Sequence, residues 1–233
     1  MKPTEFYTLL EERGLSLTDV QRDQFHRYFE LLTEWNERMN LTGITDESGV
    51  YGKHFYDSLD PFLDLDMGKL ETVCDVGTGA GFPGVPLAIA YPHLQVYLVD
   101  SLKKRIDFLK HVAAEIGLEN APAFHARAEE FCEDYRESFD VVTSRAVARL
   151  NILMELCGPL IKQDGLFVVL KGPAGDEELA EARRGLRTLG LEVVESKNAS
   201  LDIGERINIY MRKSSPTPKK YPRAFGQIKK KPL

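Results

Sequence analysis

The sequence lacks the patterns of disulfide-rich, metal-binding and membrane proteins. Its three cysteines stand far apart and form no C-x-x-C pair, so we expect neither a disulfide framework nor a metal site. Charged residues interrupt the first 14 positions, which argues against a signal peptide or a membrane span there. These absences predict a soluble, cytoplasmic protein that has no membrane partner. We also expect a monomer.

Two common nucleotide-binding signatures are also missing. No G-x-x-x-x-G-K-[ST] loop occurs, which argues against a lysine-bearing triphosphate site. Directly after the first β-rich run, the third glycine of a G-x-G-x-x-G fingerprint would fall on Phe82. A second match at Gly79, Gly81 and Gly84 begins two residues after that run, where the tight turn is already made. An NAD-dependent dehydrogenase is therefore disfavoured.

What the chain does contain is a glycine-rich strand-to-helix turn. Residues 73–84 read V-C-D-V-G-T-G-A-G-F-P-G, an apolar run with an acid followed by glycines at every second position. Glycine has no Cβ, so it reaches positive φ and lets the backbone approach a ligand. The helix that follows offers unpaired N–H groups, and Pro83 suits its first turn because a proline has no N–H to leave unpaired.

A second acid completes this pattern. The β-rich run 96–99 ends at Asp100, 19 residues beyond Gly81, where a carboxylate can accept both hydroxyls of a ribose. The arrangement resembles the S-adenosylmethionine site of Rossmann-like (class I) methyltransferases, with expected cofactor contacts at Asp75, Gly77, Gly79, Gly81 and Asp100.

The order of patterns along the chain predicts an α/β fold. About 70 residues before the glycine turn look helical, with a capping box at Thr18 and Gln21. An aromatic stripe at helical spacing, which we expect to be core, consists of Phe25, Tyr28, Phe29, Leu32 and Trp35. A further helix is expected at 51–59. Strand patterns then alternate with helix patterns, which implies parallel strands with right-handed crossovers. The expected helices after the glycine turn are 83–90, 102–116 and 176–189. The last two of the seven expected strands can close the sheet as an antiparallel hairpin. These strands are 72–76, 95–99, 122–125, 139–143, 166–170, 191–196 and 207–212.

We therefore predict three parts: an N-terminal helical cap (1–70), a Rossmann-like methyltransferase core with a seven-stranded, mostly parallel sheet (71–213) and a basic tail (214–233). The net charge is −6, yet from Arg212 onward there are eight basic residues and no acid. Four prolines there disfavour a continuous helix or a central strand. An extended basic arm with Tyr221 and Phe225 would attract a phosphate backbone, although a solvated tail that binds nothing fits this composition equally well.

Residues that activate difficult methyl acceptors are missing. After the fourth strand the chain reads T-S-R-A-V-A-R (143–149), without the N/D-P-P-Y/F-type motif of enzymes that methylate an exocyclic base amine. Methylation of a pyrimidine C5 needs a cysteine nucleophile, whereas Cys74, Cys132 and Cys157 look like inert small hydrophobes. Guanine N7 has a lone pair and no proton to remove, so alignment and electrostatics would suffice. A small-molecule acceptor, or a nucleotide-binding module without catalysis, remains open.

Several strings together carry a closer resemblance: W-N-E-R-M-N-L-T (35–42), K-H-F-Y-D-S (53–58), D-V-G-T-G-A-G-F-P-G (75–84), V-D-S (99–101), R-A-E (127–129), S-R-A-V-A (144–148) and T-P-K-K-Y-P-R (217–223). As a set they resemble the bacterial ribosomal small-subunit methyltransferase G family, also called GidB. The resemblance implies methyl transfer from S-adenosylmethionine to N7 of a guanine in the 530 loop of 16S rRNA. The implied partner is 16S rRNA or the small ribosomal subunit.

The same resemblance assigns roles to residues, without singling out a catalytic one. Gly77 and Phe82 would line the methionine and sulfonium region, and Asp100 would hold the ribose. The adenine would lie beside Ala128 and Glu129. Arg145 would meet the cofactor carboxylate or an RNA phosphate, and His54, between aromatics, is expected to be a hydrogen-bonded packing residue. The full set of expected RNA contacts is Arg127, Arg145, Arg149, Lys171, Lys219, Lys220 and Arg223.

Overall fold

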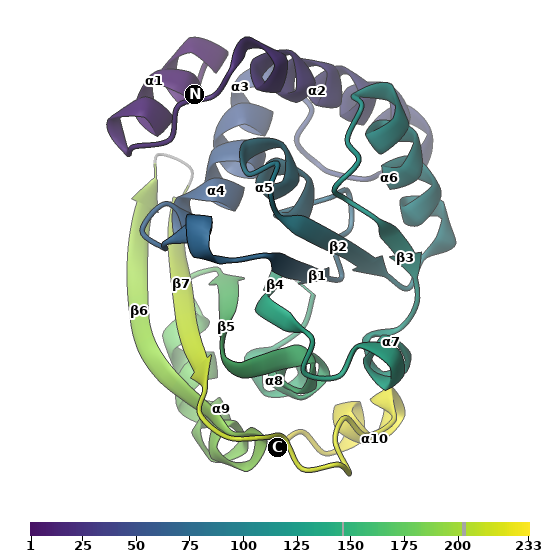
Figure 1. The fold of residues 1–233 in the computed structure, drawn as a ribbon, viewed down its shortest axis with the longest axis vertical. Coiled ribbons are helices and arrows are strands. Elements are labelled where there is room, and N and C mark those ends of the chain that lie inside the picture. The colour runs from purple at the N-terminus through teal and green to yellow at the C-terminus, as the bar shows by residue number, and fades with distance from the viewer. Residues whose placement is uncertain (146, 202–203) are drawn as a thin grey trace. The chain divides into compact units, whose positions relative to one another are not determined.

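The computed structural model describes residues 1–145, 147–201 and 204–233. Seven strands form a sheet of order β3-β2-β1-β4-β5-β7-β6 (Figure 1). Their bounds are β1 (Thr72–Val76), β2 (Gln95–Asp100), β3 (Ala123–His125), β4 (Phe139–Arg145), β5 (Ile161–Lys171), β6 (Leu191–Leu201) and β7 (Gly204–Lys213). The pairs β2–β3, β1–β4 and β4–β5 are parallel, whereas β5–β7 and β6–β7 are antiparallel. The predicted α/β class and the closing hairpin are confirmed.

The helices alternate with these strands along the chain after β1. Before β1 lie α1 (Pro3–Glu12), α2 (Asp19–Met39), α3 (Glu47–Val50), the π-helical turn η1 (Tyr51–Tyr56), α4 (Asp57–Leu59) and the 3-10 turns η2 (Asp60–Phe62) and η3 (Met67–Lys69). After it come α5 (Gly84–Ala90), α6 (Lys103–Glu115), α7 (Ala128–Tyr135), α8 (Leu150–Cys157), η4 (Gly158–Leu160), α9 (Gly175–Leu189) and α10 (Phe225–Lys230). The chain divides into two compact units, Met1–Glu71 with Thr78–His125, and Thr72–Gly77 with Ala126–Leu233.

In the first unit, helix α2 begins with the predicted capping box. The Thr18 hydroxyl accepts the Gln21 N–H at 3.3 Å, and the Gln21 side chain accepts the Thr18 N–H at 2.8 Å. The amide of Gln21 also donates to the Ile89 carbonyl at the end of α5, and that of Gln24 donates to the Ile116 carbonyl beyond α6. The carbonyls at a helix end have no intrahelical partners. Side chains of α2 therefore supply hydrogen-bond donors to carbonyls at the ends of α5 and α6.

Aromatic side chains hold the N-terminal helices together. Phe6, Phe25, Tyr51 and Phe55 are all buried, and the ring centroids of Phe25 and Phe55 lie 5.1 Å apart. The helix expected at 51–59 is present, but its first six residues form the π-helical turn η1 between two short α-helical pieces. Of the aromatic stripe on α2, Phe25, Tyr28 and Leu32 are fully buried and Phe29 and Trp35 are half-buried, so the stripe faces the core, as its helical spacing indicates.

In the second unit, the apolar segments 141–142 of β4 and 167–169 of β5 are fully buried, as expected for inner strands covered on both faces. The final hairpin is longer than predicted, because β6 and β7 remain paired from Leu191 opposite Lys213 to Leu201 opposite Gly204 (Figure 1). Helices α7, α8 and α10 also form outside the ranges assigned from sequence. Each has only six to eight residues, too short for a clear periodic pattern.

The C-terminal tail is packed on the second unit, which corrects the expectation of an extended arm. The Arg136 guanidinium donates to the carbonyls of Thr217 and Tyr221, both at 2.7 Å. Arg223 forms two side-chain hydrogen bonds with Glu155, at 2.6 and 2.8 Å, and its N–H donates to the same carboxylate. Glu155 is fully buried on α8, so the tail supplies the cation that this buried charge needs.

Within residues 1–145, 147–201 and 204–233, no helix is both long and apolar enough to span a bilayer. The same residues include no group of three or more His, Cys, Asp or Glu side chains placed to hold a metal ion.

Candidate functional site

The glycine turn of the first unit adopts a backbone that only glycine tolerates well. The Thr78 carbonyl accepts N–H groups from Gly81 and Phe82, at 2.9 and 3.0 Å, and Gly79 and Gly81 have φ of +64° and +107°. A Cβ on Gly81 would lie 2.6 Å from Cγ2 of Val85. The glycines thus shape the turn and keep its backbone uncovered by side chains of their own.

Asp100 joins this turn to the end of β2, so the two halves of the sequence pattern meet. Its carboxylate is 3% exposed, and its Oδ2 accepts the Gly79 N–H at 3.0 Å. The Leu102 N–H donates to Oδ1 at 2.9 Å, and the Arg105 guanidinium donates to Oδ2 at 3.1 Å. Three donors therefore hold the carboxylate in place.

The remaining acceptor capacity of Asp100 suits a diol. Each carboxylate oxygen accepts about two hydrogen bonds, so Oδ1 has room for one hydroxyl donor. On Oδ2 the second place is taken by Arg105, whose side chain is 38% exposed and can turn toward water. The residues present thus fit the ribose of an adenosyl cofactor, with Arg105 as its competitor at one oxygen.

Side chains from the N-terminal helices brace the turn, a feature that sequence reasoning missed. The Tyr28 hydroxyl donates to the Ala80 carbonyl at 2.6 Å. His54 stacks on Phe82 with ring centroids 4.6 Å apart, and its Nε2 shares a 2.7 Å hydrogen bond with Thr42 Oγ1. His54 is therefore a hydrogen-bonded packing residue, as predicted, while Tyr28 is both a core residue and a partner of the turn.

In the second unit, Gly77 lies against Val147, in the segment that follows β4. Its φ is +71°, and a Cβ there would lie 2.4 Å from Cγ2 of Val147. The Ser144 hydroxyl donates to the Val76 carbonyl at 2.7 Å and ties the end of β4 to the end of β1. The sequence pattern marked Val147 only within the string S-R-A-V-A (144–148) and did not predict its contact with Gly77. Ala146 of the same string lies outside the described residues.

The other expected cofactor residues of this unit lie on β1, β4 and α7. Asp75 is buried on β1, and Arg145 is the half-buried last residue of β4. Ala128 and Glu129 occupy the first turn of α7, where backbone N–H groups have no intrahelical partner. Arg127 precedes that turn with an exposed side chain, and its N–H donates to Glu130 at 3.3 Å. Their contacts with the cofactor or RNA stay predictions.

Three of the expected RNA contacts are engaged in ion pairs. Arg149 pairs with Glu181 at 2.7 Å on the surface. Lys171 is buried, pairs with Glu178 at 2.8 Å and donates to the Ala148 carbonyl at 2.5 Å. Arg223 is held by Glu155, as described above. Lys171 and Arg223 thus have structural partners, whereas Lys219 and Lys220 are exposed, and RNA contact by all of these residues stays a prediction.

All three cysteines, Cys74, Cys132 and Cys157, are buried in the second unit. Burial raises the pKa of each thiol, well above its ordinary value for Cys74 and Cys157. The thiolate is the nucleophilic form of cysteine. These side chains are therefore poor candidates for covalent catalysis.

The fold of this chain matches that of solved methyltransferase structures. A 16S rRNA (adenine(1408)-N(1))-methyltransferase from Catenulisporales acidiphilia superposes with a TM-score of 0.55 at 15% identity, covering 64% of this chain and 87% of that one. The antibiotic-resistance methyltransferase Kmr superposes with a TM-score of 0.52 at 20% identity, covering 61% and 87%. At these identities the likeness concerns the fold.

Sequence comparison identifies the family. The family model for rRNA small subunit methyltransferase G (GidB) matches residues 21–206. The ribosomal RNA small subunit methyltransferase G of Lysinibacillus sphaericus (strain C3-41) is 52% identical over 237 aligned positions that cover 100% of both chains. That of Staphylococcus carnosus (strain TM300) is 52% identical over 229, covering 96% of this chain and 95% of that one. The chain belongs to the rRNA small subunit methyltransferase G family.

Proposed function

We propose that this protein transfers a methyl group from S-adenosylmethionine to N7 of a guanine in the 530 loop of 16S rRNA, in the cytoplasm. Membership of the family supports an rRNA substrate. The observation that carries the donor assignment is the Asp100 carboxylate, buried, held by the Gly79 N–H and still able to accept a ribose hydroxyl. When bound, S-adenosylmethionine supplies an electrophilic methyl group on a positively charged sulfur.

The chain's own residues would bind and orient. Asp100 would fix the ribose, and the glycine backbone at Gly79 and Gly81 would let the rest of the cofactor lie close to the main chain. Phe82 would line the sulfonium region, held in place by the stacked ring of His54. A fixed donor lets positioning supply much of the rate enhancement.

The acceptor assignment agrees with the groups that the chain offers. Guanine N7 needs no proton removed, so the reaction requires no general base. A cysteine route to a pyrimidine C5 finds no reactive thiol among the three cysteines, because burial raises the pKa of each. Alignment of N7, the methyl carbon and sulfur in one line is the remaining requirement.

A methyl-transfer assay tests the proposal. The purified chain is incubated with S-adenosylmethionine labelled on its methyl group and, in separate reactions, 16S rRNA, small ribosomal subunits, transfer RNA and a panel of small amines and carboxylates. We expect label in the first or second reaction only, and much less with Asp100→Asn at limiting cofactor. Label in small molecules, or cofactor binding with no transfer to any substrate, would contradict the proposal.

A further inference from the structure

The basic residues from Lys213 onward fall into two groups, those with partners inside the protein and those exposed to solvent. Lys213 and Arg223 are used internally: the Lys213 ammonium donates to the Gly158 carbonyl at 2.7 Å and to Thr217 Oγ1, and Arg223 is bound by Glu155. Ile228 of α10 is fully buried and anchors the end of the chain. The other tail lysines from 219 onward point into solvent. The tail is therefore an ordered support for exposed charges.

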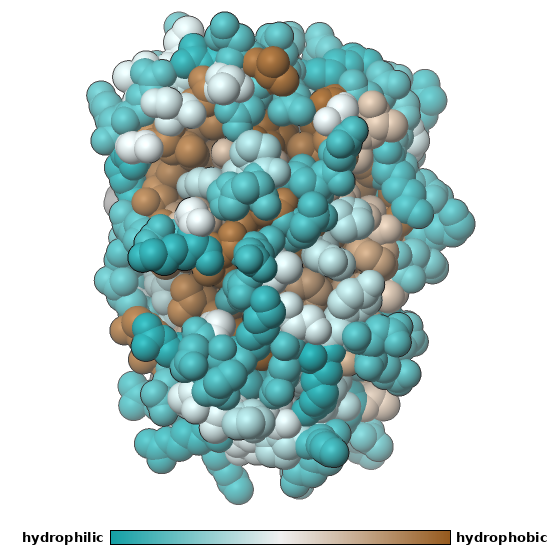
Figure 2. Space-filling view, in the orientation of Figure 1, coloured by the Kyte–Doolittle hydropathy of each residue, from teal (hydrophilic) through white to brown (hydrophobic). Residues whose placement is uncertain are grey.

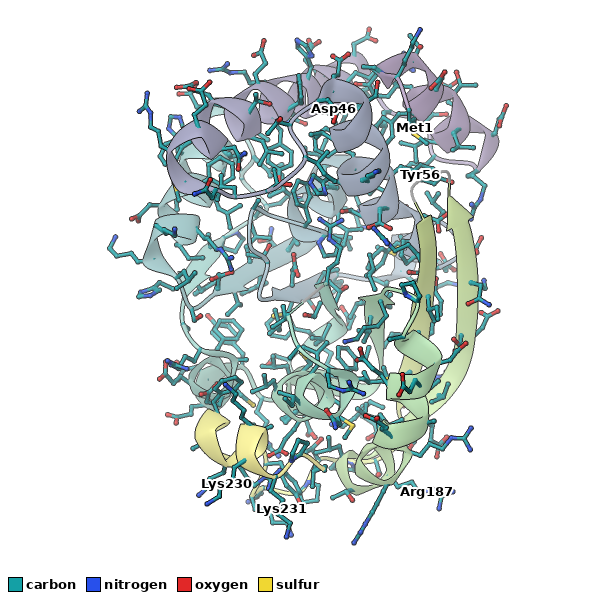
Figure 3. The ribbon with its side chains drawn as sticks, turned by 180° about the vertical axis from the view of Figure 1, so that it is seen from behind. Met1, Asp46, Tyr56, Arg187, Lys230 and Lys231 are labelled. Atoms are coloured by element: carbon teal, nitrogen blue, oxygen red, sulfur yellow. The ribbon has the colours of Figure 1, made fainter. Side chains whose placement is uncertain are left out.

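Those lysines share one end of the second unit with the C-terminal half of α9. A Cβ on Gly185 of α9 would lie 2.8 Å from the Leu233 Cβ, so the chain end rests against this helix. Figure 3 shows Arg187, Lys230 and Lys231 projecting from that end, and hydrophilic residues predominate over α10 in Figure 2. We call this surface the cationic face; its exposed members are Arg183, Arg184, Arg187, Lys219, Lys220, Lys229, Lys230 and Lys231.

The charges of the cationic face are not neutralised locally. Within the described part of the chain, none of its eight members forms an ion pair. Nearby, by contrast, the α9 carboxylates Glu181 and Glu178 pair with Arg149 and Lys171. Arg183 and Arg187 are four residues apart and Arg184 and Arg187 three, so the three arginines line one side of the helix. Arginine forks and lysine ammonium groups arranged in this way match phosphate oxygens.

The cationic face lacks the aromatic side chains that bind unpaired bases. Tyr221 is only 7% exposed, and its ring is flanked by the Lys220 ammonium at 5.2 Å and the Arg223 guanidinium at 5.8 Å. Phe225 is half-buried at the start of α10. Single-stranded nucleic acid is bound largely by stacking on exposed aromatic rings, whereas double-helical RNA is bound by shape and by phosphate contacts.

We propose that the cationic face binds the phosphate backbone of a double-helical segment of the substrate rRNA. This inference rests on the proposed function for the identity of the RNA, but it concerns a surface other than the cofactor turn. It assigns the α9 arginines a role that the sequence pattern did not, and it places the tail lysines on the same surface. Because the lysines are carried by a packed tail, the backbone loses little conformational entropy when they meet phosphates.

Salt-dependent RNA binding by the full chain tests the inference. One variant carries Arg183→Gln, Arg184→Gln and Arg187→Gln, and a second carries Lys229→Gln, Lys230→Gln and Lys231→Gln. A charge-matched control carries Lys2→Gln, Lys69→Gln and Lys110→Gln in the first unit, and a conservative control replaces the three arginines of α9 by lysine. The probes are a double-helical fragment of 16S rRNA and a single strand of equal length.

We expect the slope of log Kd against log salt on the duplex to fall by about 2 to 3 in each glutamine variant of the face, since each lost phosphate contact removes about 0.9. Both controls should keep the original slope, and all variants should keep the affinity for S-adenosylmethionine. Unchanged duplex affinity and slope in both face variants would overturn the inference, as would a loss confined to the single strand.

The two proposals fail separately. If the wild-type chain methylates no rRNA but the face variants lose duplex binding, the proposed function is wrong and the cationic face stands. If rRNA is methylated and the face variants bind the duplex like the wild type, the cationic face is wrong and the proposed function stands.

Discussion

Replacing Asp100 by asparagine should weaken cofactor binding strongly while preserving the size of the side chain. The carboxylate offers charged acceptors to the ribose, and hydrogen bonds to a charged group contribute about 1.5–3 kcal/mol against about 1 kcal/mol for neutral pairs. One hydroxyl would bond to Oδ1 and the other would replace Arg105 on Oδ2. Loss of about 1 kcal/mol at each of the two gives about 2 kcal/mol, or about a 30-fold higher Kd. Isothermal titration with S-adenosylmethionine measures this directly.

The structure also predicts a cost in stability for the same variant. Oδ1 and Oδ2 accept N–H groups of Leu102 and Gly79, and the asparagine amide would place a donor against one of them. We expect the free energy of unfolding to fall by about 1–3 kcal/mol, measured in urea. Asp107→Asn on α6 is the matched control, because Asp107 is exposed and pairs only with Lys103 among the ion pairs of that helix; it should change neither quantity. A folded Asp100→Asn protein with wild-type affinity would refute the assignment of Asp100 to the ribose.

Three further variants probe the packing around the site and the tail. Gly81→Ala should destabilise the fold by about 1–3 kcal/mol, because φ is +107° and the new Cβ meets three side chains; wild-type thermal stability would contradict this. Arg223→Ala leaves the buried Glu155 unpaired and should cost about 3–5 kcal/mol in urea unfolding, and an unchanged midpoint would show that the tail is not anchored there. Burial lowers the pKa of Lys213 to about 8, so between that pH and about 10 the unfolded chain binds more protons and the free energy of unfolding should rise with pH. Lys213→Met should flatten this rise, and equal slopes in both proteins would refute the burial argument.

Local patterns were enough to predict the frame of the molecule. The capping box of α2, the glycine turn and the apolar runs of the strands depend on neighbouring residues, and each lies where the sequence predicted it, although β5, β6 and β7 are longer than predicted. Within the first unit, the link between Gly79 and Asp100 also followed from the sequence, because consecutive βαβ elements bring strand ends together.

The contacts that the sequence did not predict are long-range and depend on side-chain direction. Tyr28 reaches Ala80 from 52 positions away, and its helical spacing marked it only as core. The hydrogen bond from the Arg105 guanidinium to Asp100 depends on the residue at which α6 begins. Glu155 gave the one usable signal for the packed tail: an acid inside the apolar stretch L-N-I-L-M-E-L-C (150–157) implies a cation brought from elsewhere in the chain.

The identities of donor and acceptor can be decided together by locating the transferred methyl group. 16S rRNA or small subunits lacking the modification are treated with the purified chain and S-adenosylmethionine, digested, and analysed by mass spectrometry. We predict a single new 7-methylguanosine, in the fragment that contains the 530 loop. A methyl group on another atom or in another fragment, or an unmodified 530 loop after complete cofactor saturation, would contradict the proposed activity.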